Sequence, residues 1–190
     1  MNASVLTAVA LTCLASLSQP VAAAPFKLSA ADPDTTKRVE AAAAASGLRQ
    51  PAAFAKQSFQ VSQDGAVVGT LVSGRATATA PDGHDNATCF AAMARGDAAT
   101  ELLRTVGAGD WEAESCIAVE AVGVLPNQAA PAVARIGIIY QAASPNATAL
   151  EPVVLVWDDA THRLGIDAAA SRKASLAGAT SLPALQRLLR

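Results

Sequence analysis

Residues 59–71 read FQVSQDGAVVGTL, and this stretch decides the fold class. β-Branched and other apolar residues lie on both sides of the pair Asp64-Gly65. A two-residue type I′ turn needs a positive φ at both central positions, which aspartate tolerates and glycine adopts readily. The stretch therefore predicts a β-hairpin. Because threonine alternates with small apolar residues further on, we expect the second strand to continue through residues 75–79.

Four more segments have the pattern of strands, namely residues 111–121, 133–141, 153–157 and 163–167. The segment 153–157 reads VVLVW and is apolar throughout, so both of its faces should be covered, as in a central strand. Most connections between the predicted strands are of hairpin length. We therefore expect one α+β domain, with an antiparallel sheet of about five to six strands and helices packed mainly on one face.

Helices are predicted where a capping residue precedes a suitable run. The predicted helices are one begun by Asp32-Pro33 and ended by Gly47, one from Asp85 or Asn86 to Gly96, one from Asp97 to Gly107, one over residues 168–176, and one capped by Ser181. In the second helix, Cys89, Phe90 and Met93 are expected to face the core. Residues 24–50 form an N-terminal helical segment, and its alternative is a mobile alanine-rich linker.

The first 23 residues have the features of a secretory signal peptide. Residues 5–17 read VLTAVALTCLASL, an uncharged apolar run that is too short to cross a bilayer, and Val21-Ala22-Ala23 offers small side chains for cleavage after Ala23. Residues 24–190 would then be the mature domain, periplasmic or secreted. We expect no stable membrane insertion once the leader is removed.

The charge balance excludes one class of partner. Fourteen lysines and arginines stand against sixteen aspartates and glutamates, which gives a formal net charge of −2. Proteins that bind nucleic acid usually carry a basic face. Nucleic acid is therefore not an expected partner.

Removal of the leader takes Cys13 away and leaves Cys89 and Cys116. An even number of cysteines in an oxidising compartment favours a disulfide between them. The alternative is two buried thiols that act as small apolar groups.

Both histidines lie in predicted turns beside carboxylates. His84 is followed by Asp85, and His162 comes shortly after Asp158 and Asp159. A metal site would need ligands from both turns, but aspartate also forms turns in its own right, so we predict no metal. A weaker alternative is a hydrolase that uses these five residues.

Other catalytic motifs and nucleotide motifs are not found in the sequence. No serine lies in a G-x-S-x-G context, and neither H-E-x-x-H, a P-loop nor G-x-G-x-x-G occurs. A disulfide between Cys89 and Cys116 would also consume the thiol nucleophiles. The sequence therefore predicts no cofactor.

Alternation along residues 111–121 places Glu112, Glu114 and Glu120 on one face of a strand, together with Cys116. Such a row would complement a basic partner, although acidic residues on a strand face are often only solvated. We treat these three glutamates as a candidate binding face.

Taken together, these features favour an exported, non-catalytic protein of the bacterial cell envelope that binds a protein or envelope polymer. An inhibitor or immunity protein is one form of this hypothesis. The alternative is an envelope hydrolase built around His84 or His162. A third hypothesis is an assembly factor whose N-terminal helix docks on a partner.

Overall fold

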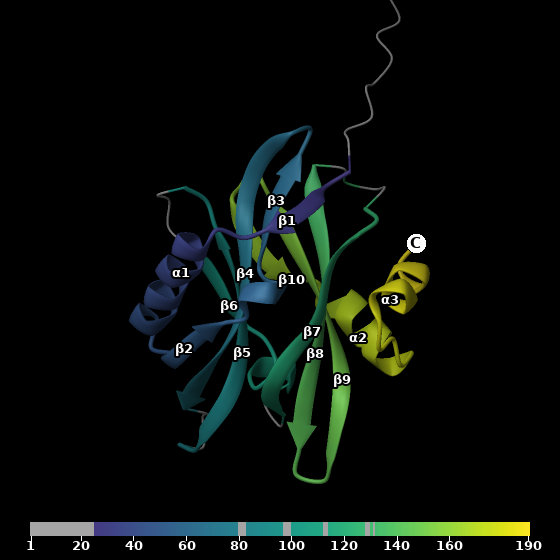
Figure 1. The fold of residues 1–190 in the computed structure, drawn as a ribbon. Coiled ribbons are helices and arrows are strands. Elements are labelled where there is room, and N and C mark those ends of the chain that lie inside the picture. The colour runs from purple at the N-terminus through teal and green to yellow at the C-terminus, as the bar shows by residue number, and fades with distance from the viewer. Residues whose placement is uncertain (1–24, 80–82, 97–99, 112–113, 128–129, 131) are drawn as a thin grey trace, which may run out of the picture.

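A computed structural model describes residues 25–79, 83–96, 100–111, 114–127, 130 and 132–190. The predicted signal peptide, residues 1–23, lies outside this part of the chain. The elements follow the order β1 (Lys27–Ala30), α1 (Pro33–Ala45), β2 (Arg49–Ala53), the short 3-10 helix η1 (Ala55–Gln57), β3 (Phe59–Gln63), β4 (Ala66–Thr79), β5 (Asp85–Ala94), β6 (Glu101–Arg104), the 3-10 helix η2 (Gly109–Trp111), β7 (Ser115–Leu125), β8 (Val133–Ser144), β9 (Ala147–Asp158), β10 (Arg163–Ile166), α2 (Ala168–Leu176) and α3 (Leu182–Leu188) (Figure 1).

The strands form two antiparallel sheets. The first has the order β1-β3-β4-β5-β6, with β2 paired to β4, and the second has the order β10-β9-β8-β7. The sheets face each other, and the largest apolar cluster lies between them, with residues such as Leu71, Met93, Ile136 and Leu155 (Figure 1). The antiparallel α+β class is confirmed. The prediction of a single sheet of five to six strands is wrong, because the strands divide between two sheets.

The β-hairpin predicted around Asp64-Gly65 is present. β3 and β4 pair antiparallel up to Gln63 and Ala66, and the turn residues Asp64 and Gly65 have φ values of 51° and 80°. Positive φ at both positions agrees with the turn expected from this dipeptide. β4 then continues to Thr79, as the alternation of its residues predicts.

The predicted helices over residues 85–96 and 97–107 are wrong. β5 instead pairs with β4 over ten residue positions, and β6 pairs with β5. Cys89 and Met93 face the second sheet, whereas Phe90 and Ala92 pack under α1. Because β5 is buried on both faces, its sequence lacks the apolar–polar alternation that would have indicated a strand.

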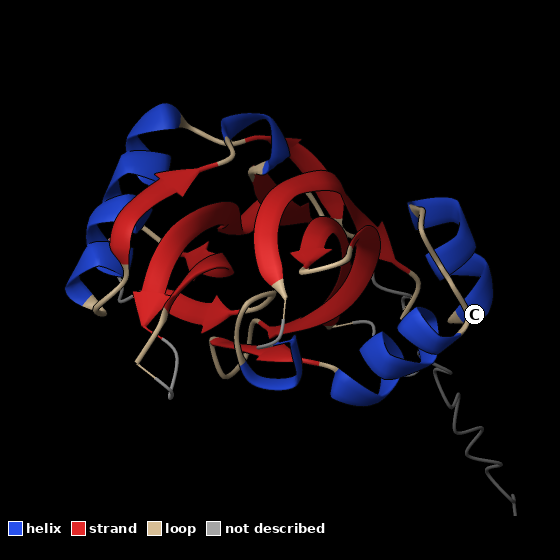
Figure 2. Cartoon of the chain, turned by 90° about the horizontal axis from the view of Figure 1, so that it is seen from below, coloured by secondary structure: helices blue, strands red, loops and turns tan. Residues whose placement is uncertain are grey.

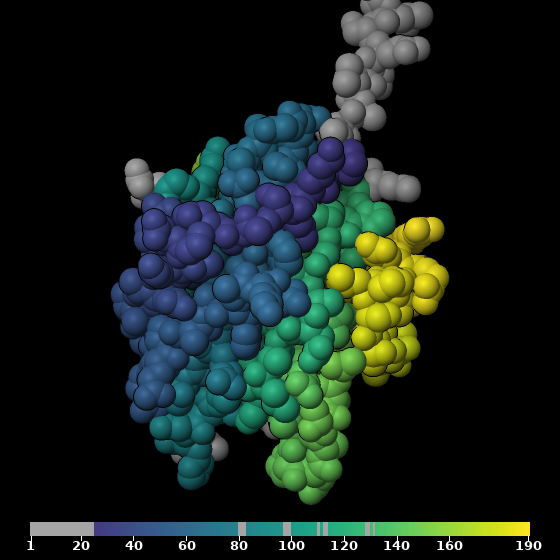
Figure 3. Space-filling model, viewed as in Figure 1, coloured from purple at the N-terminus to yellow at the C-terminus, as the bar shows by residue number. Residues whose placement is uncertain are grey.

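The helices cover the outer faces of both sheets, which corrects the expectation that they pack mainly on one face (Figures 1 and 2). α1 packs on the first sheet through Val39 and Ala43, both fully buried. α2 and α3 pack on the second sheet through residues such as Ala174 and Leu185, also fully buried. In the space-filling view the two C-terminal helices protrude from one side of the molecule (Figure 3).

Cys89 and Cys116 form a disulfide with a Cα–Cα distance of 5.2 Å, as predicted. The bond joins β5 of the first sheet to β7 of the second. Cys116 is 3% exposed and does not lie on a polar face. Simple alternation fails here because the pairing of β7 with β8 shifts twice, between Cys116 and Ala118 and between Val119 and Ala121.

β9 lies between β8 and β10, so the predicted central strand is confirmed. The predicted helices after Asp32, after Asp167 and after Ser181 are also present, each with the side chain of that residue accepting a hydrogen bond at its N-terminus. Among the described residues, no helix is both long enough and apolar enough to cross a membrane.

Candidate functional site

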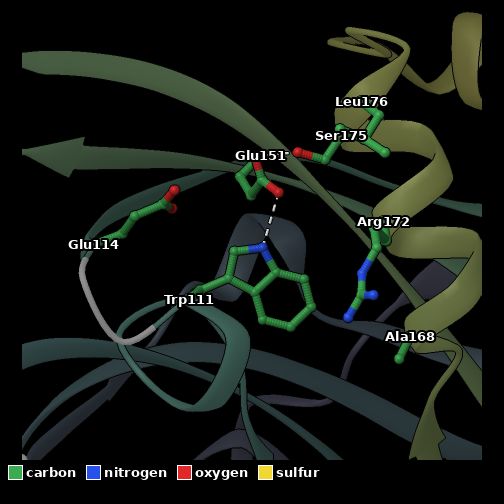
Figure 4. A pocket seen from close by; sticks show the side chains of 7 residues that line it. All are labelled: Trp111, Glu114, Glu151, Ala168, Arg172, Ser175 and Leu176. Atoms are coloured by element: carbon green, nitrogen blue, oxygen red, sulfur yellow. Dashed lines mark hydrogen bonds between the residues drawn. The ribbon is translucent and has the colours of Figure 1, made fainter.

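A pocket of about 400 Å³ opens where β9, η2 and α2 meet. β10 pairs with β9 only from Leu155 to Asp158, and beyond that point α2 takes its place along the same edge. The peptide groups of Val154 show this, because its N–H donates to Ser171 Oγ at 2.9 Å and its carbonyl accepts from the Asp167 N–H at 2.8 Å. The lining residues are Trp111, Glu114, Glu151, Ala168, Arg172, Ser175 and Leu176 (Figure 4).

Glu151 forms the inner wall of the pocket. It lies opposite the buried Tyr140 in the pairing of β8 with β9, so its side chain points to the inner side of the second sheet. Trp111 Nε1 donates to Glu151 Oε1 at 2.8 Å, and Ser175 Oγ donates to Oε2 at 3.2 Å. With only 9% of its surface exposed, Glu151 is therefore held in one orientation by groups from η2 and α2.

Glu114 faces Glu151 and has a different environment. Its backbone is fixed, because its N–H donates to the Trp111 carbonyl at 3.1 Å and its carbonyl accepts from Asn86 Nδ2 at 2.8 Å. Glu114 Oε2 is buried and accepts no hydrogen bond from the described residues. Burial, and secondly the charge of Glu151, raise the pKa of the Glu114 carboxyl group.

Residues of α2 line the side of the pocket opposite Glu114 (Figure 4). In Figure 4 the Arg172 guanidinium lies across the Trp111 ring from Glu114. Leu176 is 84% exposed at the end of α2 and lines the same pocket. The pocket therefore combines two carboxylates, an indole ring, a guanidinium and an exposed aliphatic side chain.

The structure describes two of the three glutamates predicted to share a face, Glu114 and Glu120, and these two have different environments. Glu112 lies outside the described residues. Glu114 turns into the pocket, whereas Glu120 is exposed on β7, where its carbonyl accepts from Gln57 Nε2 at 3.1 Å. The register shifts of β7 separate positions that strict alternation would align.

His84 lies beside an ion pair at the start of β5. His84 is exposed just before β5, and Asp85 pairs with Arg49 and accepts from Thr79 Oγ1 at 3.2 Å. The hydrogen bond and charge of Arg49 lower the pKa of Asp85. Asp85 thus links β5 to its neighbouring elements.

The turn at His162 has a different arrangement. The imidazole stacks on Trp157 with 6.3 Å between ring centroids, contacts the Arg95 guanidinium, and lies 4.0 Å from Asp159 Oδ1. Asp158 closes the turn by accepting from Thr161 Oγ1 at 2.8 Å, the contact that does most to lower its pKa.

The structure does not bring the two histidine turns together. His84 precedes the first residue of β5, whereas His162 contacts Arg95, which follows the last. A strand advances about 3.3 Å per residue, so the turns lie about 30 Å apart. Among the described residues, no group of three or more histidine, cysteine, aspartate or glutamate side chains is placed to hold a metal ion.

The sequence predictions missed Trp111, Glu151 and Arg172 as members of one site. Glu151 offered a signal, since it is a charged residue directly before the apolar run 152–157. Trp111 and Glu151, however, are 40 residues apart in the sequence, and the folding of the strands between them brings them together.

Comparison of the chain with protein families, with curated proteins and with solved structures finds no match.

Proposed function

We propose that this chain is an exported, non-catalytic protein of the cell envelope that binds a protein or envelope partner at the pocket beside α2. The apolar leader favours export, and the disulfide between Cys89 and Cys116 is compatible with an oxidising compartment outside the cytoplasm. An inhibitor or immunity protein is one form that such a binding protein takes.

The observation that carries this proposal is Leu176, which is 84% exposed on the rim of the pocket. It lies on a helix that protrudes from the molecule, and it lines the same pocket as an indole ring and two carboxylates (Figures 3 and 4). The same pocket is lined by Trp111 and Arg172, and tryptophan and arginine are enriched at the centres of protein interfaces.

The hydrolase alternative gains less support. A hydrolase site that uses both His84 and His162 would need the two histidines in one cleft, whereas the two turns lie at opposite ends of β5. Each turn also has a structural explanation: Asp85 is paired with Arg49, and Asp158 closes its own turn. We therefore favour binding over hydrolysis.

The proposal is tested by capturing partners from an envelope extract with three baits: the wild-type mature protein, Leu176→Asp, and Val67→Asp as a matched control. Val67 is also an exposed apolar residue, at 53%, but it lies on the β3–β4 hairpin. We expect a partner that binds wild type and Val67→Asp and is lost with Leu176→Asp. Equal capture by all three baits, or no specific partner, would contradict the proposal.

A further inference from the structure

The Glu151 carboxylate is held by two neutral donors, the Trp111 indole N–H and the Ser175 hydroxyl. Neither donor contributes a positive charge. Glu114 faces this carboxylate with a buried oxygen that accepts no hydrogen bond from the described chain. Two carboxylates therefore meet at one side of the pocket, and in Figure 4 the Arg172 guanidinium lies on the other side of the indole ring.

We infer that this side of the pocket takes a basic side chain, a lysine ammonium or an arginine guanidinium, presented by a polypeptide partner. The inference rests on the proposed function and names the partner chemistry at its site. A cation between Glu114 and Glu151 would offset the repulsion between them, and in a partly enclosed site that attraction is screened less than on an open surface.

The other walls of the pocket fit the rest of such a side chain. Lysine and arginine carry apolar methylene groups before their charged ends. The Trp111 ring and the exposed Leu176 give these groups apolar contacts, and an indole face also attracts cations. A volume of about 400 Å³ leaves room for one side chain and part of its backbone.

The protonation of Glu114 is also consistent with a basic side chain as the ligand. Burial and the charge of Glu151 raise the pKa of Glu114, so this group takes up a proton at a higher pH than an ordinary glutamate. A cation bound beside it would lower that pKa again. Affinity for a basic side chain should therefore fall as the pH is lowered through the range in which Glu114 becomes protonated.

The inference is tested by titrating the ¹⁵N-labelled mature protein with the peptides acetyl-Ala-Lys-Ala-amide and acetyl-Ala-Arg-Ala-amide. The matched control peptide replaces lysine by norleucine, which keeps the methylene chain and removes the charge. The Trp111 indole N–H signal reports on the site, Trp157 provides an internal reference, and Trp111→Phe assigns the two signals. Butylamine as a further ligand separates a basic side chain from any small free amine.

We expect the lysine or arginine peptide to shift the Trp111 signal in a saturable way and to leave the Trp157 signal in place. Glu114→Gln should weaken binding about threefold to tenfold, in the range of one partly buried ion pair. Glu120→Gln, which changes an exposed glutamate on β7, the strand that follows Glu114, should bind like wild type. Glu151→Gln keeps an acceptor for Trp111 and serves as the second test variant if Glu114→Gln does not fold.

Equal shifts with the norleucine peptide, or unchanged affinity in both glutamine variants, would overturn the inference. Butylamine that binds as well as the peptides would also overturn the assignment to a polypeptide. If the glutamine variants bind the captured partner normally while Leu176→Asp does not, the partner site stands and only the basic side chain is rejected.

Discussion

Glu114 and Glu151 are residues of the same type, but their carboxylates have different hydrogen-bond donors. Glu151 has a donor for each carboxylate oxygen, from η2 and from α2. Glu114 has one buried oxygen without a donor among the described residues, and its pKa is raised. A buried carboxylate without partners costs stability in its charged form. This cost is consistent with the binding role proposed for Glu114.

Removal of the Glu114 charge should stabilise the domain near neutral pH. Because its pKa is raised in the folded state, stability is greatest where Glu114 is protonated and falls as the pH rises through the folded-state pKa. We expect Glu114→Gln to raise the melting temperature at pH 7 and to change it little at pH 3.5. Thermal melts at both pH values measure this difference.

The control for this experiment is Glu120→Gln, which removes an exposed charge from β7, the strand that follows Glu114, and should leave the melting temperature unchanged at either pH. A lower melting temperature of Glu114→Gln at pH 7 would show that the Glu114 carboxylate supports the fold. In that case its pKa would not carry the functional meaning given to it here.

At the scale of elements, α2 depends on Asp167. The Asp167 carboxylate accepts from the Ala170 N–H at 3.0 Å as the N-cap, and its other oxygen accepts from Arg135 Nη2 at 2.8 Å. Both members of this ion pair are partly exposed, Asp167 with 28% and Arg135 with 19% of the side chain accessible. Asp167 thus fixes the start of the helix that carries Arg172, Ser175 and Leu176 into the pocket.

We expect Asp167→Ala to lower the free energy of unfolding by about 1–2 kcal/mol, since an N-cap contributes about 1 kcal/mol and a partly exposed ion pair up to about 1 kcal/mol. Asp167→Asn retains a capping side chain and should cost less. Urea denaturation of both variants measures these differences. Asp34→Ala removes a well-exposed partner of Lys37 and should be neutral. Equal losses in all three variants would contradict the structural role of Asp167.

The elements also show what could be predicted from the sequence. Local signals worked where a few neighbouring residues decide the structure, as in the Asp64-Gly65 turn and the caps Asp32 and Ser181. The cap at Asp167 is not predicted, because the sequence pattern assigns this residue to the preceding strand. Local signals failed for β5, because its two faces are both buried: Cys89 and Met93 lie on one face and Phe90 on the other. The spacing of these three residues in the sequence is the same as that of apolar residues on one side of a helix. Long pairing with β4 overrides the helix propensity of the alanines in β5.

On the scale of the whole molecule, three layers of packing hold the chain together: α1 on the first sheet, the two sheets on each other, and α2 with α3 on the second sheet. The disulfide of Cys89 and Cys116 links the two sheets across the central layer. The division into two sheets could not be predicted from the sequence, since hairpin-length connections fit one sheet or two equally well. The pocket depends on this division and was therefore also missed.

The proposed function requires that the chain is exported and that Cys89 and Cys116 are oxidised. Intact-mass analysis of the untagged protein, purified from its own cells without reducing agent, tests this requirement most directly. We expect the mass of residues 24–190 with both cysteines oxidised, recovered from the envelope or medium fraction. A cytosolic protein that still begins at Met1 and carries titratable thiols at Cys89 and Cys116 would contradict the account.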